Sequence, residues 1–192
     1  MGKTSVAGGM VMFRFEIEPG LALKPLELDD ADALFKMIDQ SREHLRGFLA
    51  FVDLTESVDD TRAFVEETVH SNADRKSFVV VILVDDEVAG LTGFNQINRM
   101  NKSAELGYWL GAPFVRKGVM SKAVRAVIDY GFGELGLNRV VLRAATRNQA
   151  SRGVAEKLNF VNEGTVREAE WVNDRFVDHV IYRMLKREWK TK

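Results

Sequence analysis

A short stretch in the middle of the 192-residue chain combines residue types that could hold a phosphate group. Arg116, Lys117 and Gly118 stand directly before a long predicted helix and shortly after a predicted strand that ends at Leu110. The first backbone N–H groups of a helix have no partner inside it, and the helix dipole favours an anion at that end. The stretch fits a diphosphate site about as well as a tight turn with solvated cations. It matches neither a Walker loop nor the three-glycine dinucleotide fingerprint.

A second polar motif, Asn148 and Ser151, begins another predicted helix soon after a strand. Taken alone, this spacing favours a helix cap, in which one side chain accepts a backbone N–H of the first turn. Farther on, Asp178 and His179 could supply a base. Since His179 alternates with apolar neighbours along a predicted strand, a structural histidine is favoured there. Three aromatic side chains are expected in the core rather than stacked on a ligand: Trp109, Phe160 and Trp171.

Composition excludes several classes of protein. The chain has no cysteine, so disulfide scaffolds, thiolate zinc sites and cysteine nucleophiles are ruled out, and no metal site is expected. The 27 Lys and Arg residues balance 28 Asp and Glu residues, which argues against a dedicated nucleic-acid binder. The longest apolar run, Phe78–Val84, is far too short to span a bilayer. We therefore expect a cytoplasmic protein without membrane contact or direct nucleic-acid contact.

The length fits one domain, which we place at residues 13–192, after a flexible N-terminal extension of residues 1–12 that is either native or left over from cloning. The first half predicts a strand over residues 21–28, a helix capped by Asp29, and a second helix that starts at Ser57 with Asp60 completing a capping box. Three strands follow, over residues 78–84, 88–97 and 103–110. The apolar residues expected to be buried by the two helices are Leu34, Phe35, Ile38, Phe64 and Val65.

The second half predicts a long helix, then a strand over residues 138–146, a helix from Asn148 to about Leu158, and two strands around a tight turn at Asn173-Asp174. Helices placed between strands, with one strand–helix–strand crossover, indicate a mixed sheet covered by helices. The long helix ends at Gly136, and its apolar stripe consists of Val124, Val127, Ile128, Gly131 and Leu135.

From about Leu21 to Trp189 the chain resembles the GNAT superfamily of N-acetyltransferases, which bind acetyl-coenzyme A (acetyl-CoA). The superfamily's coenzyme A signature is Gln/Arg-x-x-Gly-x-Gly/Ala. It appears here as Val115-Arg-Lys-Gly118-Val-Met120, in which only the central glycine matches strictly. The wider pattern is more specific and looks like the branch that acetylates the N-termini of ribosomal proteins, including ribosomal-protein-serine acetyltransferases. The matching segments are AELGYWL, RKGVMSKAV, NRVVLRAATRNQASRGVAEKLNF and VNDRFVDHVIYRMLKREW.

The resemblance implies an α/β (α+β) fold with a mixed, mostly antiparallel sheet, flanked by about four helices. Two central parallel strands, 103–110 and 138–146, would splay apart, and acetyl-CoA would lie between them like an extra strand. Its pantetheine amides would pair with backbone groups near Trp109 and Leu110, and its diphosphate would bind N–H groups of residues 116–121. The residues expected to bind the cofactor are Trp109, Leu110, Val115, Arg116, Lys117, Gly118, Val119, Met120, Ser121, Asn148 and Ser151.

The implied reaction is direct attack of a neutral primary amine on the acetyl thioester. An α-amine with a pKa of about 7.7–8.0 costs only about 1 kcal/mol to deprotonate near pH 7, whereas a lysine with a pKa of about 10.4 costs about 4.6 kcal/mol. A mild base therefore suffices for an α-amine. Glu105 is the candidate base, with a solvated charge or a partner for an arginine as its alternative role. Ser151 is the candidate hydroxyl donor to the departing thiolate, with helix capping as its alternative.

These implications predict an acetyl-CoA-dependent N-acetyltransferase that acts on the N-terminal α-amine of a protein, with ribosomal proteins as the favoured acceptors. Two alternatives stay open: transfer to a small amine such as a polyamine, an amino acid or an antibiotic, and a non-catalytic acyl-CoA-binding module. By resemblance to relatives that dimerise, a homodimer is expected. A polycationic acceptor would need acids around its cleft, for which the candidates are Asp53, Glu56, Asp59 and Asp60.

Overall fold

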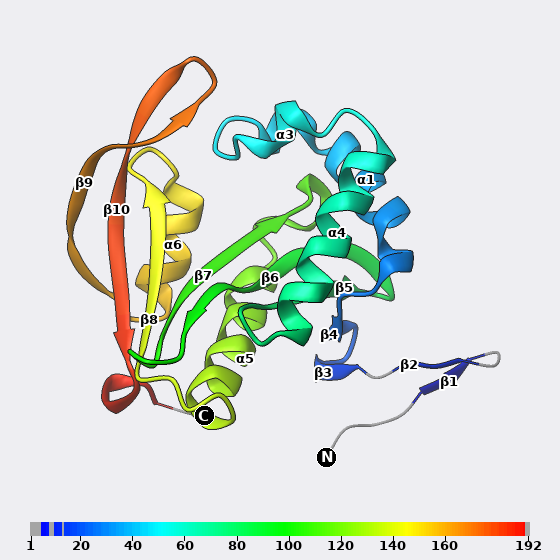
Figure 1. The fold of residues 1–192 in the computed structure, drawn as a ribbon, viewed down its shortest axis with the longest axis horizontal. Helices are drawn as coiled ribbons and strands as arrows, with labels where there is room; N and C mark the ends of the chain where they lie inside the picture. Colours follow the sequence, from blue (N-terminus) through cyan, green and yellow to red (C-terminus); the bar gives the residue numbers. More distant parts are fainter. Residues whose placement is uncertain (1–4, 8–9, 13, 191–192) are drawn as a thin grey trace.

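The computed structural model describes residues 5–7, 10–12 and 14–190, and Figure 1 shows their fold. Eight strands form one sheet in the order β3-β4-β5-β6-β7-β8-β10-β9, and β1 and β2 form a separate two-stranded sheet. Neighbouring strands of the large sheet run antiparallel except β7 and β8, which are parallel. The strands are β1 (Ser5–Ala7), β2 (Met10–Met12), β3 (Phe15–Glu18), β4 (Leu21–Pro25), β5 (Phe78–Val84), β6 (Glu87–Asn98), β7 (Ser103–Leu110), β8 (Arg139–Ala145), β9 (Val161–Val172) and β10 (Arg175–Leu185).

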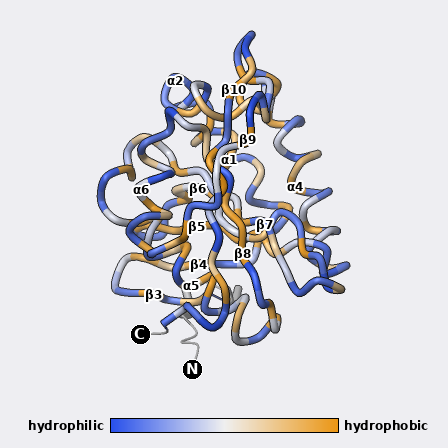
Figure 2. Tube along the Cα trace, turned by 90° about the vertical axis from the view of Figure 1, so that its left-hand side faces the viewer, coloured by the Kyte–Doolittle hydropathy of each residue, from blue (hydrophilic) through white to orange (hydrophobic). Residues whose placement is uncertain are grey.

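Six α-helices lie among these strands in the part of the chain that the structure describes. α1 and α4 pack against each other on one face of the sheet, whereas α5 and α6 cover the other (Figures 1 and 2). Four of the α-helices have nine or more residues, so the predicted mixed sheet with about four flanking helices is confirmed. The helices are α1 (Ala31–Gln40), α2 (Arg42–Leu45), α3 (Phe51–Leu54), α4 (Val58–Ala73), α5 (Val119–Gly133) and α6 (Gln149–Lys157), with 3-10 helices η1 (Leu28–Asp30), η2 (Ala112–Phe114) and η3 (Lys186–Glu188).

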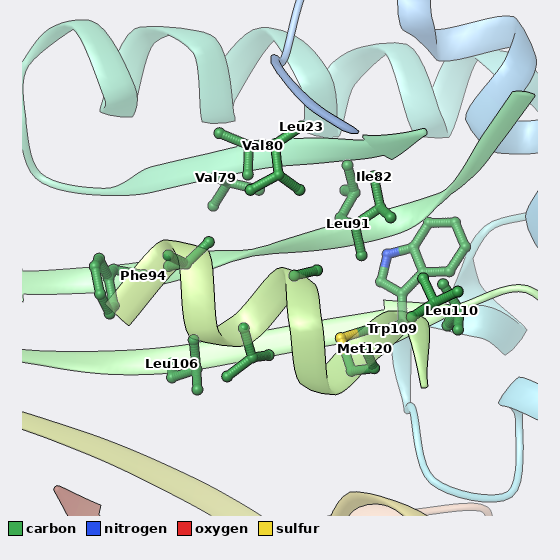
Figure 3. Packing of buried hydrophobic residues seen from close by; sticks show 14 of the residues in the cluster. Leu23, Val79, Val80, Ile82, Leu91, Phe94, Leu106, Trp109, Leu110 and Met120 are labelled. Carbon is green, nitrogen blue, oxygen red and sulfur yellow. The ribbon is translucent and has the colours of Figure 1, made fainter. Parts of the chain in front are cut away.

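The hydrophobic core forms where the sequence patterns place it. The apolar run predicted as a strand coincides with β5, whose five central residues are buried. The predicted stripe of α5 is buried from Val124 to Gly131, with both Val124 and Ile128 0% exposed. The helix ends at Gly133 rather than near Gly136, so Leu135 lies beyond it and is only partly buried. Figure 3 shows Met120 on this helix and, next to the helix, Phe94 of β6 and Leu106 of β7. The strand–α5–strand crossover is therefore fixed by buried apolar surface on the helix side of the sheet.

Two local motifs are confirmed at the residues where the sequence predicts them. Ser57 caps α4, because its hydroxyl accepts the Asp60 N–H (3.4 Å) while the Asp60 carboxylate accepts the Ser57 N–H (2.8 Å). Hydrogen bonds from Ser57 lower the pKa of Asp60. Asn173 and Asp174 both have positive φ, 48° and 62°, in the turn between β9 and β10. Both motifs need only residues that are close in the chain.

Other local expectations are wrong. α1 begins at Ala31 with Asp30 rather than Asp29 as its N-cap, because the 3-10 helix η1 precedes it. Phe64 is 48% exposed on α4, since the buried side of that helix carries Val65 and two threonines rather than an apolar stripe. Trp171, expected in the core, is 55% exposed. In each case the outcome depends on a neighbouring element, which local patterns do not show.

The N-terminal segment lies only partly within the described residues. Residues 1–4, 8–9 and 13 of the expected extension and its junction lie outside them, whereas residues 5–7 pair with residues 10–12 as β1 and β2. β1, β2, β3, α2 and α3 have three or four residues each, too few for periodicity to predict. Within the described ranges, none of the helices has the length and apolar character needed to cross a bilayer.

Candidate active site

The parallel strands β7 and β8 pair at one end only. Their register runs from Ser103 opposite Arg139 to Leu106 opposite Leu142. Beyond this point β7 continues to residue 110 and β8 to residue 145, while the two strands diverge (Figure 1). The predicted divergence is confirmed, and we call residues 107–110 and 143–145 the splay. Backbone groups along the facing edges of the splay could pair with an extended ligand.

Trp109 and Leu110 lie in the splay, as predicted. On the other edge of β7 they pair with Leu91 and Gly90 of β6. Their side chains are only 9% and 8% exposed, in the core. A ligand in the splay would therefore meet the backbone of these two residues rather than their side chains.

The N-terminus of α5 has the geometry of an anion site. Gly118, its N-cap, has φ of 78°, in the left-handed region that favours glycine. A Cβ added there would meet nothing within 4 Å, so the space beside it is open. The first helical bond runs from the Lys122 N–H to the Gly118 carbonyl (3.3 Å), which leaves the N–H groups of residues 119–121 ahead of the helical ladder. These donors suit the oxygens of a diphosphate.

The residues that depart from the coenzyme A signature pack inward. Met120 is 9% exposed and belongs to the core together with Val119, and Val115 packs against that core. A phosphate-binding turn built from backbone N–H groups does not depend on these side chains. The departures at Val115 and Met120 therefore leave the backbone site intact.

The two predicted cations lie at the surface next to this turn. Arg116 and Lys117 are exposed, and Arg116 itself has a positive φ of 62°. The Lys117 Nζ lies 5.9 Å from the centre of the Phe114 ring. Ser121, in the first turn of α5, is half-buried. Both cations could add long-range attraction for an anion at the helix end.

The start of α6 is held by a cap and by an arginine. The Asn148 side-chain Oδ1 accepts the Ser151 N–H (3.0 Å), which confirms Asn148 as a helix cap. Arg152 donates to the Thr146 carbonyl and to the Tyr182 hydroxyl, each at 3.1 Å. These bonds fix the first turn of α6 against β8 and β10, so the Ser151 side chain has a defined position.

Tyr108 contacts Ser151, which the sequence did not predict. The Tyr108 Oη lies 3.0 Å from the Ser151 Oγ and donates to the Ser151 carbonyl (3.1 Å). Burial raises the pKa of Tyr108 to about 12, so its hydroxyl stays protonated near neutral pH. The available signal was strand alternation, since Tyr108 follows the buried Leu106 by two residues and so shares its face.

Glu105, the predicted base, lies on the opposite face of β7 from Tyr108, because the two residues are three positions apart. Its carboxylate lies 3.3 Å from the Nε of Arg143, which is on β8. The side chain of Glu105 is 40% exposed. Its alternative role as a partner for an arginine is therefore present in the structure, at the edge of the splay.

A second carboxylate lies near the end of β8. His179 on β10 is opposite Ala145, and its Nε2 lies 3.1 Å from the Glu170 Oε2. Glu170 had no predicted role, because its contact with His179 depends on the register of the β9–β10 hairpin, in which Glu170 is opposite Val177. Glu105 and Glu170 are thus the two carboxylates that the structure brings to this region. Asp178 differs from them, since the Glu168 N–H and Arg167 hold its carboxylate and lower its pKa.

A cavity of ≈ 190 Å³ lies at the carboxyl end of β8, and we call it the acceptor cleft after the role that we propose for it. The loop between α2 and α3 forms one wall and the β9–β10 hairpin forms the other. The Asn173 side-chain amide donates to the Arg46 carbonyl and so links these two walls. The lining residues are Gly47, Phe48, Ala145, Thr146, Arg147, Val172, Arg175, Phe176, Val177 and Asp178.

The acceptor cleft combines aromatic surface with positive charge. Phe176 is 57% exposed and packs edge-on against Trp171, with ring centres 4.8 Å apart. Arg147 and Arg175 in the lining are both exposed. Trp171, predicted as a core residue, instead supports an aromatic side chain at this surface.

Three of the four acids proposed to attract a polycation already have partners. Asp53 pairs with Arg46 (3.1 Å), and Asp59 pairs with Arg62. Asp60 is engaged in the cap of α4. These three carboxylates are therefore balanced or used in capping.

Comparison with known proteins agrees with this geometry. Residues 21–161 match the family model described as an acetyltransferase (GNAT) domain. The Bacillus subtilis (strain 168) protein named "Putative ribosomal N-acetyltransferase YdaF" is 34% identical over 180 residues, covering 93% of this chain and 98% of that protein. The ribosomal-protein-serine acetyltransferase of Escherichia coli (strain K12) is 30% identical over 169 residues, covering 87% of this chain and 93% of that protein.

Comparison with a solved structure supports the same family. RimL, a ribosomal L7/L12 α-N-protein acetyltransferase in complex with coenzyme A, matches with a TM-score of 0.87 and 26% identity, covering 90% of this chain and 97% of that one. Coenzyme A forms a disulfide with a cysteine in that complex, a bond that this chain, which has no cysteine, cannot make.

The chain therefore belongs to the GNAT acetyltransferases and is an acetyl-CoA-dependent N-acetyltransferase. Within that superfamily it falls in the branch of the ribosomal-protein N-acetyltransferases. The structure fits acetyl-CoA in two places: the diverging edges of β7 and β8 suit an extended pantetheine arm, and the open turn at Gly118 suits a diphosphate. Neither feature depends on the side chains that depart from the signature.

Proposed function

We propose that this enzyme acetylates the N-terminal α-amine of a protein, with ribosomal proteins as the favoured acceptors. The observation that carries the proposal is the chemistry of the acceptor cleft, which combines aromatic side chains with Arg147 and Arg175. Asp178 in the same lining is paired with Arg167, so Arg147 and Arg175 leave the lining positive. This charge disfavours a polyamine with several ammonium groups more than a peptide, which brings a single ammonium group and side chains that can pack on Phe48 and Phe176. The names of the ribosomal-protein relatives support the same acceptor class.

Acetyl-CoA supplies an acetyl thioester. The residues of this chain accept the proton of the amine and donate a hydrogen bond to the leaving sulfur. We assign Glu105 as the base that takes a proton from the attacking amine, directly or through a water molecule. Ser151 donates a hydrogen bond to the sulfur as the C–S bond breaks and its electron pair moves there. An α-amine with a pKa of about 8 needs little help from such a base, whereas a lysine side chain needs several kcal/mol more.

A thiol-release assay across amines tests the proposal. The panel contains peptides with free Ser or Ala N-termini, the same peptides with blocked N-termini and an internal lysine, spermidine, and free amino acids. We expect release only with free N-terminal peptides, and mass spectrometry should place one acetyl group on the α-amine. Faster release with spermidine or an amino acid would overturn the assignment of acceptor. Tight CoA binding with no release for any amine would instead support a non-catalytic binding module.

A further inference from the structure

We propose that Tyr108 is a positioning residue that lets Ser151 donate its hydroxyl hydrogen to the departing sulfur. The inference rests on the proposed role of Ser151 in the acetyl transfer. Tyr108 lies on β7, two residues past the last pairing with β8, and Ser151 lies in the first turn of α6, which follows β8. The contact therefore links the β7 side of the splay to the β8 side, on the face of the sheet that α5 and α6 cover.

The hydrogen bonds of the resting pair have one consistent direction. The Ser151 carbonyl can only accept, so the Tyr108 hydroxyl that contacts it at 3.1 Å donates to it. The Tyr108 oxygen then accepts the Ser151 hydroxyl hydrogen across 3.0 Å. In this arrangement the hydrogen of Ser151 is engaged by the Tyr108 oxygen and does not point at another acceptor.

A thiolate in the splay would reverse this direction without breaking a covalent bond. Rotation about the Ser151 Cβ–Oγ bond turns the hydroxyl hydrogen toward the sulfur. Tyr108 then rotates its own hydrogen from the Ser151 carbonyl to the Ser151 Oγ, so the serine oxygen keeps a partner. Because burial raises the pKa of Tyr108 to about 12, the tyrosine contributes a hydrogen bond and keeps its proton.

The alternative is that the contact only braces α6 against β7. Binding of CoA and of desulfo-CoA, which lacks the thiol, separates the two roles. If Ser151 stabilises the thiolate, bound CoA has a thiol pKa below that of the free thiol, which is about 8.5 by analogy with cysteine. Affinity for CoA then increases as pH rises toward that value. The pH dependence of the affinity for desulfo-CoA, which has no thiol, reflects only the titratable groups of the protein.

The experiment measures these affinities by calorimetry for the wild type, Tyr108→Phe, Ser151→Ala and the double variant. We expect Ser151→Ala to remove about a tenfold gain of CoA over desulfo-CoA at high pH, and Tyr108→Phe to remove a large part of it. Tyr108→Phe should change nothing further in the Ser151→Ala background, and it should lower kcat with little change in the KM for the amine. Tyr130→Phe is the matched control, because Tyr130 stacks on Phe78 (4.4 Å) away from the splay.

The measurements distinguish a bracing role of Tyr108 from a positioning role. Equal losses of affinity for CoA and desulfo-CoA in Tyr108→Phe would show a brace and overturn the proposal, as would an unchanged pH dependence in that variant. A pH dependence that needs both hydroxyls would support it even if no protein N-terminus proved to be the acceptor. Failure of the acceptor assignment is therefore distinct from failure of the Tyr108–Ser151 pair.

Discussion

The proposed diphosphate site and the acceptor cleft differ in the groups that form them: backbone N–H groups at the first, and side chains at the second. At the proposed diphosphate site, three consecutive residues, 119–121, have backbone N–H groups ahead of the helical ladder at the start of α5. At the acceptor cleft, the lining comes from three segments that are far apart in the chain, and side chains such as Phe48, Arg147 and Phe176 supply its chemistry. A backbone site tolerates sequence change as long as its turn is kept, whereas a side-chain site changes with each substitution.

This difference explains how one fold can keep a donor and vary its acceptor. The signature turn has diverged at Val115 and Met120 and retains its geometry, because the turn depends on Gly118. The acceptor cleft depends on where the α2–α3 loop meets the β9–β10 hairpin, a contact made by Asn173 and the Arg46 carbonyl. Variants at the two ends should therefore behave differently, with coenzyme A affinity changing at one end and acceptor choice at the other.

The largest effect is expected from Gly118→Pro. Proline removes the backbone N–H and fixes φ near about −65°, so we expect CoA affinity to fall by more than about 100-fold. Gly118→Ala is the matched variant, because it keeps the N–H and its Cβ has open space. It bears the strain of the left-handed conformation, about 1–2 kcal/mol, in the free and the bound protein alike. We therefore expect lower stability but a change in CoA affinity of less than about threefold. Calorimetry measures both, with thermal unfolding as a check that each variant folds.

Glu105→Gln should have the next largest effect, on turnover rather than on cofactor binding. Loss of a general base lowers rates by about 100-fold or more, so we expect kcat for a peptide acceptor to fall by about 100-fold at unchanged CoA affinity. Steady-state kinetics and calorimetry measure the two quantities. Glu170→Gln is the matched variant, since it removes the other carboxylate near the end of β8. Undiminished turnover in Glu105→Gln, with a loss in Glu170→Gln, would move the base to the β9–β10 hairpin.

The elements predicted from the sequence are those whose signals are local. The limits of β5 and β7, the buried stripe of α5, the Ser57–Asp60 cap and the turn at Gly118 each depend on residues within a few positions of one another. The unpaired backbone N–H groups at a helix start are present whatever tertiary contacts the rest of the chain makes. The sequence could therefore indicate an anion site at Gly118 before any tertiary contact was known.

The features that the sequence did not reveal depend on contacts between distant segments. Tyr108 and Ser151 are 43 residues apart, and Asn173 and Arg46 are 127 apart. Glu170 reaches its histidine through the register of the hairpin, in which Glu170 is opposite Val177, two residues before His179. Trp171 lies in the same hairpin, on β9, and is exposed there.

Arg175→Glu should alter acceptor choice by a smaller factor. A reversed charge at the lining of the acceptor cleft should lower kcat/KM by about tenfold for peptides with an acidic residue near the N-terminus, and raise it for basic ones. CoA affinity should not change. Arg187→Glu is the matched control, because Arg187 is exposed on η3, beyond the other end of β10. Equal effects of both reversals would mean that overall charge, and not the cleft, governs the choice.

Lys117→Ala should have the smallest effect, and it tests whether the diphosphate end is truly a backbone site. The exposed Lys117 ammonium can attract phosphate only through solvent-screened charge, so we expect CoA affinity to fall by about two- to fivefold. The loss should shrink as salt is added, whereas the loss in Gly118→Pro should persist, because a missing N–H cannot be screened. Calorimetry at low and high salt measures both. If Lys117→Ala instead matched Gly118→Pro, side chains would dominate both ends of the site, and the contrast between them would fail.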